Sequence, residues 1–206
     1  MLLTILYLIG ITAEAMTGAI LAGKQKMDWF GVMFVASATA IGGGTVRDII
    51  LGHHPVGWIK HPEYILITCI AGIFTTLIAH WVARHKKLFI VLDSIGLVVF
   101  SIIGCRVAID MDLSPIICVI AAIITGIFGG LLRDLLCRQT PLVLHKELYA
   151  SVSLVTASLY LVLLYYGVED SLAVMVTLLS GFTLRMTALK FSWSLPVFHF
   201  EQEKIE

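Results

Sequence analysis

The chain has 206 residues, of which 59% are hydrophobic and 14% are charged, whereas an average soluble domain has roughly 45–50% and about 25%. This composition is typical of a membrane protein and excludes an ordinary soluble domain. Lys plus Arg and Asp plus Glu number 14 each, so there is no basic excess that would favour a nucleic-acid partner.

Seven stretches are candidates for membrane-spanning helices, because a spanning helix needs about 20 mostly apolar residues. They are 2–22, 29–51, 63–83, 88–109, 113–138, 147–166 and 170–190. The first has no basic segment before it and carries Glu14 in its middle, so we predict a retained helix and not a signal peptide. We therefore expect a single transmembrane domain over 1–190 and a cytoplasmic tail over 191–206.

Signatures of enzymes and metal sites are missing from the sequence. The four cysteines lie in or beside apolar stretches, without the spacing of a disulfide framework or a metal clip. His53 and His54 precede Pro55 in a turn, where we interpret them as loop residues. Arg106 and Arg185 fall near helix ends, where snorkelling to the interface is the ordinary explanation. We predict no enzymatic activity, no cofactor and no metal site.

Basic residues gather in alternate connections between the predicted helices. One side receives Lys24, Lys26, Arg84, Lys86, Lys87, Arg138, Lys146, Lys190 and Lys204, and the other receives Lys60 and the acidic turns at 110–112 and 169–170. Because basic loops stay in the cytoplasm, we predict an amino terminus outside and a carboxyl terminus in the cytoplasm.

The second apolar stretch contains the motif GGGTVRD, in which Gly42, Gly43 and Gly44 precede Arg47 and Asp48. A glycine run favours bending or opening of a helix, and the two charges are costly at membrane depth unless they face partners or a polar path. One interpretation is close helix packing through small residues. The other is a broken helix that lines a water path with its own backbone and with hydroxyls such as that of Thr45. The two interpretations are compatible.

A weaker copy of this motif, GGLLRD, lies in the fifth apolar stretch. It supplies Gly129, Gly130, Arg133 and Asp134 at a constant offset of 86 from the first copy, and Phe128 stands where the first copy has Gly42. The same offset relates further glycines without a gap, Gly10 to Gly96 and Gly18 to Gly104. The chain is therefore predicted to be an internal duplication.

The duplication divides the chain into two blocks of three helices, 1–86 and 87–172, followed by a seventh helix over 170–190. Since three is an odd number, the second block must enter the membrane upside down relative to the first. In such inverted repeats, ion and substrate paths follow interrupted helices at the interface of the halves. We predict an all-α membrane fold with a 3+3 inverted repeat plus one helix, and with broken second and fifth helices.

The two motif arginines are expected at opposite ends of this path. At about 1.5 Å per residue, Arg47 lies near the outer end of the second helix and Arg133 near the inner end of the fifth. Neighbours at i and i+1 point to different helix faces, so Asp48 and Asp134 are not expected to pair with them. Each arginine then needs a partner from another helix.

The fourth predicted helix supplies such a partner. Asp93 lies at about the depth of Arg133, which predicts an Asp93–Arg133 ion pair between helices. Its repeat mate Tyr7 lies at about the depth of Arg47 and predicts a phenol–guanidinium contact there. Glu14, in the middle of the first helix, is a further functional candidate because ionisable groups at that depth are costly.

These features resemble the prokaryotic branch of the trimeric intracellular cation (TRIC) channels, a membrane family that has also carried a glycine-transporter label. The resemblance rests on the seven-helix pattern and on the duplicated glycine–arginine–aspartate motif. It implies a homotrimer in the (inner) membrane of a bacterium or archaeon, with one pore per subunit lined by the first, second, fourth and fifth helices. It also implies conduction of potassium and sodium, with membrane lipids as further partners.

A channel and a secondary transporter of a small zwitterion such as glycine remain the two alternatives. Both place the path at the repeat interface. A transporter is expected to hold paired charges near mid-membrane, where the sequence places Glu14 and neither arginine. This distribution favours a channel in which arginine–acid contacts form removable constrictions.

Overall fold

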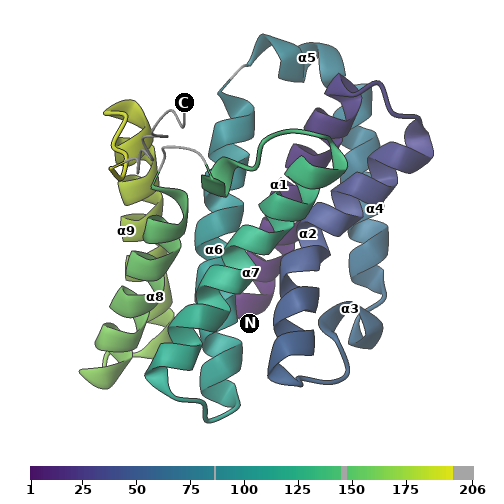
Figure 1. Cartoon of the computed structure of the whole chain (residues 1–206). Helices are drawn as coiled ribbons and strands as arrows, with labels where there is room; N and C mark the ends of the chain where they lie inside the picture. The colour runs from purple at the N-terminus through teal and green to yellow at the C-terminus, as the bar shows by residue number, and fades with distance from the viewer. Residues whose placement is uncertain (86, 145–147, 197–206) are drawn as a thin grey trace, which may run out of the picture.

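The computed structural model of the chain describes residues 1–85, 87–144 and 148–196, and the regular elements of these residues are all helices (Figure 1). The elements are α1 Leu2–Lys24, α2 Trp29–Leu51, α3 Gly57–Lys60, α4 Glu63–Leu77, α5 Ala79–Arg84, α6 Leu88–Asp110, α7 Pro115–Leu136, the 3-10 helix η1 Leu142–Leu144, α8 Tyr149–Tyr165 and α9 Asp170–Lys190. Each of the seven predicted spans overlaps one of the longer helices, although α1 and α6 end one or two residues beyond the predicted bounds. An all-helical fold is confirmed.

Within the described residues, five helices are long and apolar enough to cross a membrane, namely α1, α2, α6, α7 and α9. The other two apolar helices are shorter, 15 residues for α4 and 17 for α8. The predicted span 63–83 is divided at Ile78 into α4 and α5. Thr75 and Thr76 donate hydrogen bonds to carbonyl oxygens of the preceding turn, and this competition with the helical ladder often bends helices.

Four helices form the centre of the bundle. α1 packs against α2 and α6, and α7 packs against the same two helices. Small buried residues let these helices approach closely, among them Ala36 and Ala40 on α2 and Ala121 and Ala122 on α7. In Figure 1, α4 covers one side of this centre, and α8 and α9 lie together on the opposite side.

The helix bounds follow the offset of 86 seen in the sequence. α1 and α6 begin at 2 and 88 and end at 24 and 110, α2 and α7 begin at 29 and 115, and α4 and α8 begin at 63 and 149. The packing follows it too, because α4 contacts α1 and α2 as α8 contacts α6 and α7. Lys86 and Lys146, the latter the mate of Lys60, lie outside the described residues, as does the predicted tail from residue 197 onwards.

The prediction of broken second and fifth helices is wrong. α2 is helical without interruption from Trp29 to Leu51, and α7 from Pro115 to Leu136. The glycines serve the crossing of these two helices instead. A Cβ on Gly43 would strike the carbonyl oxygen of Thr125, and a Cβ on Gly129 would strike that of Thr39. Each glycine thus allows the backbone of the other helix to come into direct contact, since only a residue without Cβ permits this approach.

Candidate functional site

A group of buried polar side chains is centred on Arg133, which is 0% exposed. Its Nη1 donates to Asp93 Oδ1 at 2.8 Å and to Thr17 Oγ1 at 3.0 Å, and its Nε donates to Asp134 Oδ1 at 2.8 Å. Tyr149 Oη donates to the same Asp93 oxygen at 3.1 Å. The predicted Asp93–Arg133 ion pair is confirmed.

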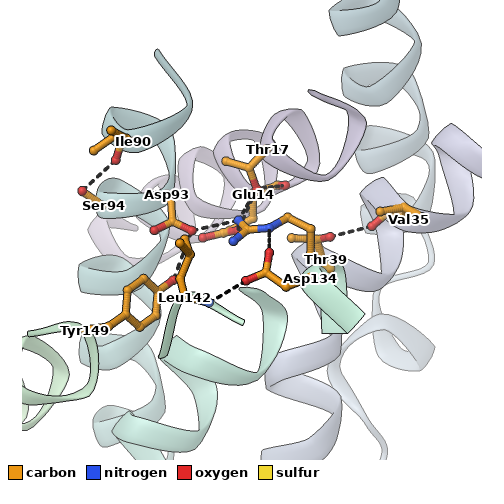
Figure 2. A network of polar contacts seen from close by, with 11 residues as sticks. Glu14, Thr17, Val35, Thr39, Ile90, Asp93, Ser94, Asp134, Leu142 and Tyr149 are labelled. Atoms are coloured by element: carbon orange, nitrogen blue, oxygen red, sulfur yellow. Dashed lines mark hydrogen bonds and ion pairs between the residues drawn. The ribbon is translucent and has the colours of Figure 1, made fainter. Parts of the chain in front are cut away.

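Glu14 completes this group, with Oε2 3.8 Å from Arg133 Nη1. Figure 2 shows its side chain, Thr17, Asp93, Asp134 and Tyr149 converging on one point. We call these five residues and Arg133 the Arg133 cluster. Its members come from α1, α6, α7 and α8. The cluster therefore ties both halves of the chain together in the centre of the bundle.

The Arg133 guanidinium reaches from the end of α7 toward the middle of the bundle. Asp93 is the sixth residue of α6, near its start, whereas Glu14 lies midway along α1. The ring of Phe89 covers one face of the guanidinium, with its centroid 4.7 Å from Cζ. The buried Arg133 guanidinium is thus held by carboxylates and by an aromatic face.

A second, smaller group surrounds Arg47 near the end of α2. Its Nε and Nη2 donate to Asp48 Oδ1 at 2.9 and 2.7 Å. His53 Nδ1 lies 3.1 Å from the same oxygen, and its side chain is 42% exposed. We call Arg47, Asp48 and His53 the Arg47 cluster. In Figure 1, α2 descends toward α3, and α7 rises toward the opposite end of the bundle, so the two clusters lie toward opposite ends.

The expectation that neighbouring arginine and aspartate do not pair is wrong at both motifs. Arg47 bonds Asp48, and Arg133 bonds Asp134. The spacing rule describes where Cβ atoms point, but the arginine side chain is long enough to fold across its own helix. Arg133 therefore pairs both with Asp134 on its own helix and with Asp93 on α6.

The phenol–guanidinium contact predicted between Tyr7 and Arg47 is not found as a hydrogen bond among the described residues. The Tyr7 ring lies against the rings of Tyr64 and Phe100, with centroids 4.7 and 6.1 Å apart. Asp48 already provides the acceptor for two Arg47 nitrogens. The two ends of the bundle are thus chemically different.

Each aspartate also anchors the loop that follows its helix. Gly57 N donates to Asp48 Oδ2 at 3.1 Å, and Leu142 N donates to Asp134 Oδ2 at 2.9 Å. These backbone groups begin α3 and η1, the short helices that return the chain toward α4 and α8. In each motif, one carboxylate oxygen of the aspartate therefore binds the neighbouring guanidinium, and the other oxygen binds the backbone of the following loop.

The remaining motif residues have supporting positions. Gly44 and Gly130 lie one helical turn before the arginines, and a Cβ on them would come within 3.7 Å of Arg47 Nη2 and 3.4 Å of Arg133 Nη2. A Cβ on Gly42 would meet the Leu132 side chain. Thr45 Oγ1 donates to the Ile41 carbonyl of its own helix at 2.8 Å. These residues leave room for the arginines or seal the helix contact.

Three residues that form or support the Arg133 cluster were not predicted from the sequence: Thr17, Tyr149 and Arg185. Thr17 could have been found, because it lies one helical turn from Glu14 on α1. Arg185 was expected to snorkel, but it is 2% exposed and its Cζ lies 4.8 Å from the centroid of the Tyr149 ring. The last helix thus supports a ring whose hydroxyl donates to Asp93. No periodicity or spacing in the sequence indicates this stacking.

The residues described by the structure include no group of three His, Cys, Asp or Glu side chains placed to hold a metal ion. The chemistry of the two clusters is electrostatic. They hold fixed positive charge beside carboxylates in a protein interior, which is the arrangement that lines or closes paths for small ions.

Comparison with known proteins gives a consistent assignment. A family model described as "Glycine transporter" matches residues 4–80 and 90–165, two stretches that begin 86 residues apart. A UPF0126 membrane protein of Vibrio cholerae is 41% identical over 95% of this chain and 83% of its own length. The UPF0126 inner membrane protein YadS of Escherichia coli K12 is 34% identical over 98% of this chain and 99% of its own.

Among solved structures, the trimeric intracellular cation channel orthologue from Rhodobacter sphaeroides superposes with a TM-score of 0.89 and 31% identity. The match covers 93% of this chain and 98% of that one. The family and the matched structures are transport and channel proteins, not enzymes. The sequence resemblance and the fold therefore lead to one family.

Proposed function

Because the chain belongs to the membrane-protein family described as glycine transporters, whose fold it shares with solved TRIC cation channels, we propose that it is a cation channel. Its permeant ions are potassium and sodium. The working unit is a homotrimer in the inner membrane, surrounded by lipid, with one pore in each subunit. The amino terminus faces outside and the carboxyl terminus faces the cytoplasm.

The proposed pore runs between α1, α2, α6 and α7, the four helices that meet in the centre. Seven helices span the membrane, with α4 and α8 as the shortest, and the two halves are inverted copies. The reciprocal contacts at the α2–α7 crossing support this symmetry, since Gly43 meets Thr125 as Gly129 meets Thr39. In inverted repeats the path follows the interface of the halves.

The observation that carries the proposal is the position of Arg133. It bonds groups from α1, α6 and α7 at once and is fully buried, so in this conformation it closes the space between the pore helices. Its charge is permanent and repels cations while it stands in the path. Carboxylates that remain when the guanidinium moves aside, above all Asp93, would then attract them. The Arg133 cluster is the proposed gate.

The Arg47 cluster forms the opposite mouth of the same path. Arg47 and Asp48 are buried, and the exposed His53 ring marks where the cluster meets solvent. Gly44 and Gly130 flank the two arginines, Gly42 faces the Leu132 side chain, and Tyr7 adds an aromatic surface near the Arg47 end. Cations pass both clusters in series.

Transport of glycine is the second candidate, because the family model carries that description. A zwitterion needs a free cationic group for its carboxylate and a free anionic group for its amine. Arg133 and Arg47 already bond protein carboxylates with Nε and a terminal nitrogen. This arrangement favours small ions over a zwitterion as the transported species.

Purified protein in liposomes separates the two functions. We expect loss of trapped potassium down its gradient, at a rate proportional to the gradient, without uptake of labelled glycine. The matched variants are Arg133→Gln, which removes the proposed gate charge, and Lys60→Gln at the far surface. Saturable glycine uptake that Arg133→Gln abolishes, with no potassium flux in either protein, would establish the transporter instead.

A further inference from the structure

If Glu14 is ionised, the hydrogen atoms on the groups around Thr17 are too few for the hydrogen bonds that the short contacts there require. Thr17 Oγ1 lies 2.8 Å from the Glu14 carbonyl oxygen and 3.1 Å from Glu14 Oε2. A hydroxyl has one hydrogen, so it serves only one of these contacts. The shorter contact, to the carbonyl, is the usual bond of a helical threonine. The contact with Oε2 then lacks a hydrogen unless Glu14 supplies it.

Arg133 does not supply that hydrogen either. The two hydrogens of Nη1 go to Asp93 Oδ1 at 2.8 Å and to Thr17 Oγ1 at 3.0 Å. Glu14 Oε2 lies 3.8 Å from this nitrogen, beyond hydrogen-bond distance. With a proton on Oε2, Glu14 donates to Thr17, Thr17 donates to the carbonyl, and Arg133 donates to both Thr17 and Asp93. Each of these contacts then has one hydrogen, while Arg133 Nη2 has no hydrogen-bond partner among the described residues.

The other two carboxylates have sufficient donors. Asp93 receives Arg133 and Tyr149, and Asp134 receives Arg133 and the backbone N of Leu142. Glu14 is 1% exposed, and a Cβ on Gly96 of α6 would strike its Oε1. Oε1 accepts no hydrogen bond from the described residues. Glu14 is therefore a buried carboxyl group pressed against a backbone and short of donors.

Charge balance points the same way. The titratable and charged groups that face Glu14 are Asp93 from α6, Arg133 and Asp134 from α7 and Tyr149 from α8, with Arg185 from α9 behind the Tyr149 ring. Lys24 of α1 is exposed to solvent. If Glu14, Asp93 and Asp134 were all ionised, three negative charges would lie within 4 Å of the single Arg133 guanidinium, and excess buried charge is costly away from water. One added proton reduces this excess.

We propose that Glu14 is a proton-binding site, and that its proton holds the Arg133–Asp93 pair in the closed position. When Glu14 loses the proton, its carboxylate competes with Asp93 for the guanidinium, which needs to move only from a 3.8 Å separation to a hydrogen bond. Asp93 is then released toward the path. The role of this proton in gating rests on the proposed channel function, whereas its presence does not.

Infrared spectroscopy tests the proton without any assay of transport. Wild-type protein in lipid at neutral pH is expected to show the carbonyl band of a protonated carboxyl group, shifted when the protein is made with carbon-13 glutamate. The band disappears in Glu14→Gln and persists in Glu169→Gln, which changes an exposed glutamate. It moves in Thr17→Val, which removes the hydrogen-bond acceptor, and returns in Thr17→Ser. A spectrum without a glutamate-dependent carboxyl band overturns the proposal.

Potassium flux from liposomes tests the coupling. In wild type and in Glu169→Gln, flux is expected to rise several-fold as the pH is raised and Glu14 loses its proton. Glu14→Gln, which imitates the protonated form, keeps the low flux at every pH. A wild-type rise that persists in Glu14→Gln refutes the coupling. If the infrared band is present but no variant passes potassium at any pH, the channel proposal fails while the proton site stands.

Discussion

The two motif arginines occupy equivalent positions in the sequence but very different surroundings in the structure. Arg47 has one carboxylate partner and an exposed histidine beside it. Arg133 has three carboxyl groups within 4 Å and no exposed member in its cluster. The duplicated motif thus lies in one cluster that is balanced in charge and reaches solvent, the Arg47 cluster, and in one that is buried and rich in acidic groups, the Arg133 cluster.

The difference comes from the helices around the motif. At the positions where Arg133 meets Asp93 and Glu14, the offset of 86 gives Tyr7 and Phe100 in the other half. Both motifs keep the local arginine–aspartate bond and the loop anchored by the aspartate. The repeat therefore preserves the local arginine–aspartate contacts, while the different residues on α1 and α6 confine the acidic cluster to one end of the bundle.

Removing the arginine should destabilise the fold more at the Arg133 cluster than at the Arg47 cluster. Arg133→Gln leaves buried carboxylates without their cation, which typically costs about 3–5 kcal/mol. Arg47→Gln costs less, because Asp48 keeps Gly57 N and His53 as neighbours. Chemical unfolding of both variants in detergent measures the difference. Equal losses at the two arginines would remove the distinction between the clusters.

The α2–α7 crossing should respond equally in both halves. Gly43→Ala and Gly129→Ala place a Cβ against a facing carbonyl oxygen, and overpacking of this kind costs about 1–3 kcal/mol. Gly44→Ala is the matched control, since its nearest heavy atom is 3.7 Å away. Thermal unfolding should rank Gly44→Ala close to wild type. A loss as large as that of Gly43→Ala would argue against the crossing described above.

Removing the Tyr149 hydroxyl should lower stability by a smaller amount, through the Arg133 cluster alone. Tyr149→Phe removes the 3.1 Å bond to Asp93, and a hydrogen bond to a charged group is worth about 1.5–3 kcal/mol; the long distance favours the lower value. The ring remains over Arg185. Tyr165→Phe, at a residue 87% exposed, should leave both unfolding and potassium flux unchanged. Identical behaviour of the two variants would contradict the role of this bond.

The smallest effect is expected outside both clusters, at Glu169. Hydrogen bonds from Ser171 and from the backbone N of Leu172 hold the pKa of this carboxyl group below its usual range. A lowered pKa in the folded state adds stability that is complete above the usual value and is lost as the pH falls below about 4. The unfolding temperatures of wild type and Glu169→Gln should therefore differ slightly at neutral pH and converge in acid.

Much of the fold could be predicted from the sequence because membrane helices are long and the duplication is regular. The offset of 86 correctly related the helix starts, and it led to the Asp93–Arg133 pair through estimates of depth. The predicted breaks in α2 and α7 were wrong because a glycine run permits either bending or close approach. The neighbouring helix, which the sequence does not place, decides between them.

The full composition of the Arg133 cluster could not be predicted from the sequence, for a different reason. Counting residues along the helices places Glu14 at mid-membrane and Arg133 near the inner end, and so predicts no contact between them. The length of the arginine side chain joins them, as it also joins Arg133 to Asp134. Tyr149 enters through the packing of α8 and α9 on the centre. Side-chain reach and helix tilt, which no periodicity records, determine these contacts.

Currents through single proteins in a planar bilayer test the central proposal most directly. With unequal potassium chloride on the two sides, a cation channel gives discrete unitary currents that reverse near the potassium equilibrium potential. Arg133→Gln should alter the time spent open, whereas Lys60→Gln should not. A bilayer that contains inserted trimers and shows no unitary current, or currents that reverse near the chloride potential, would contradict a cation channel.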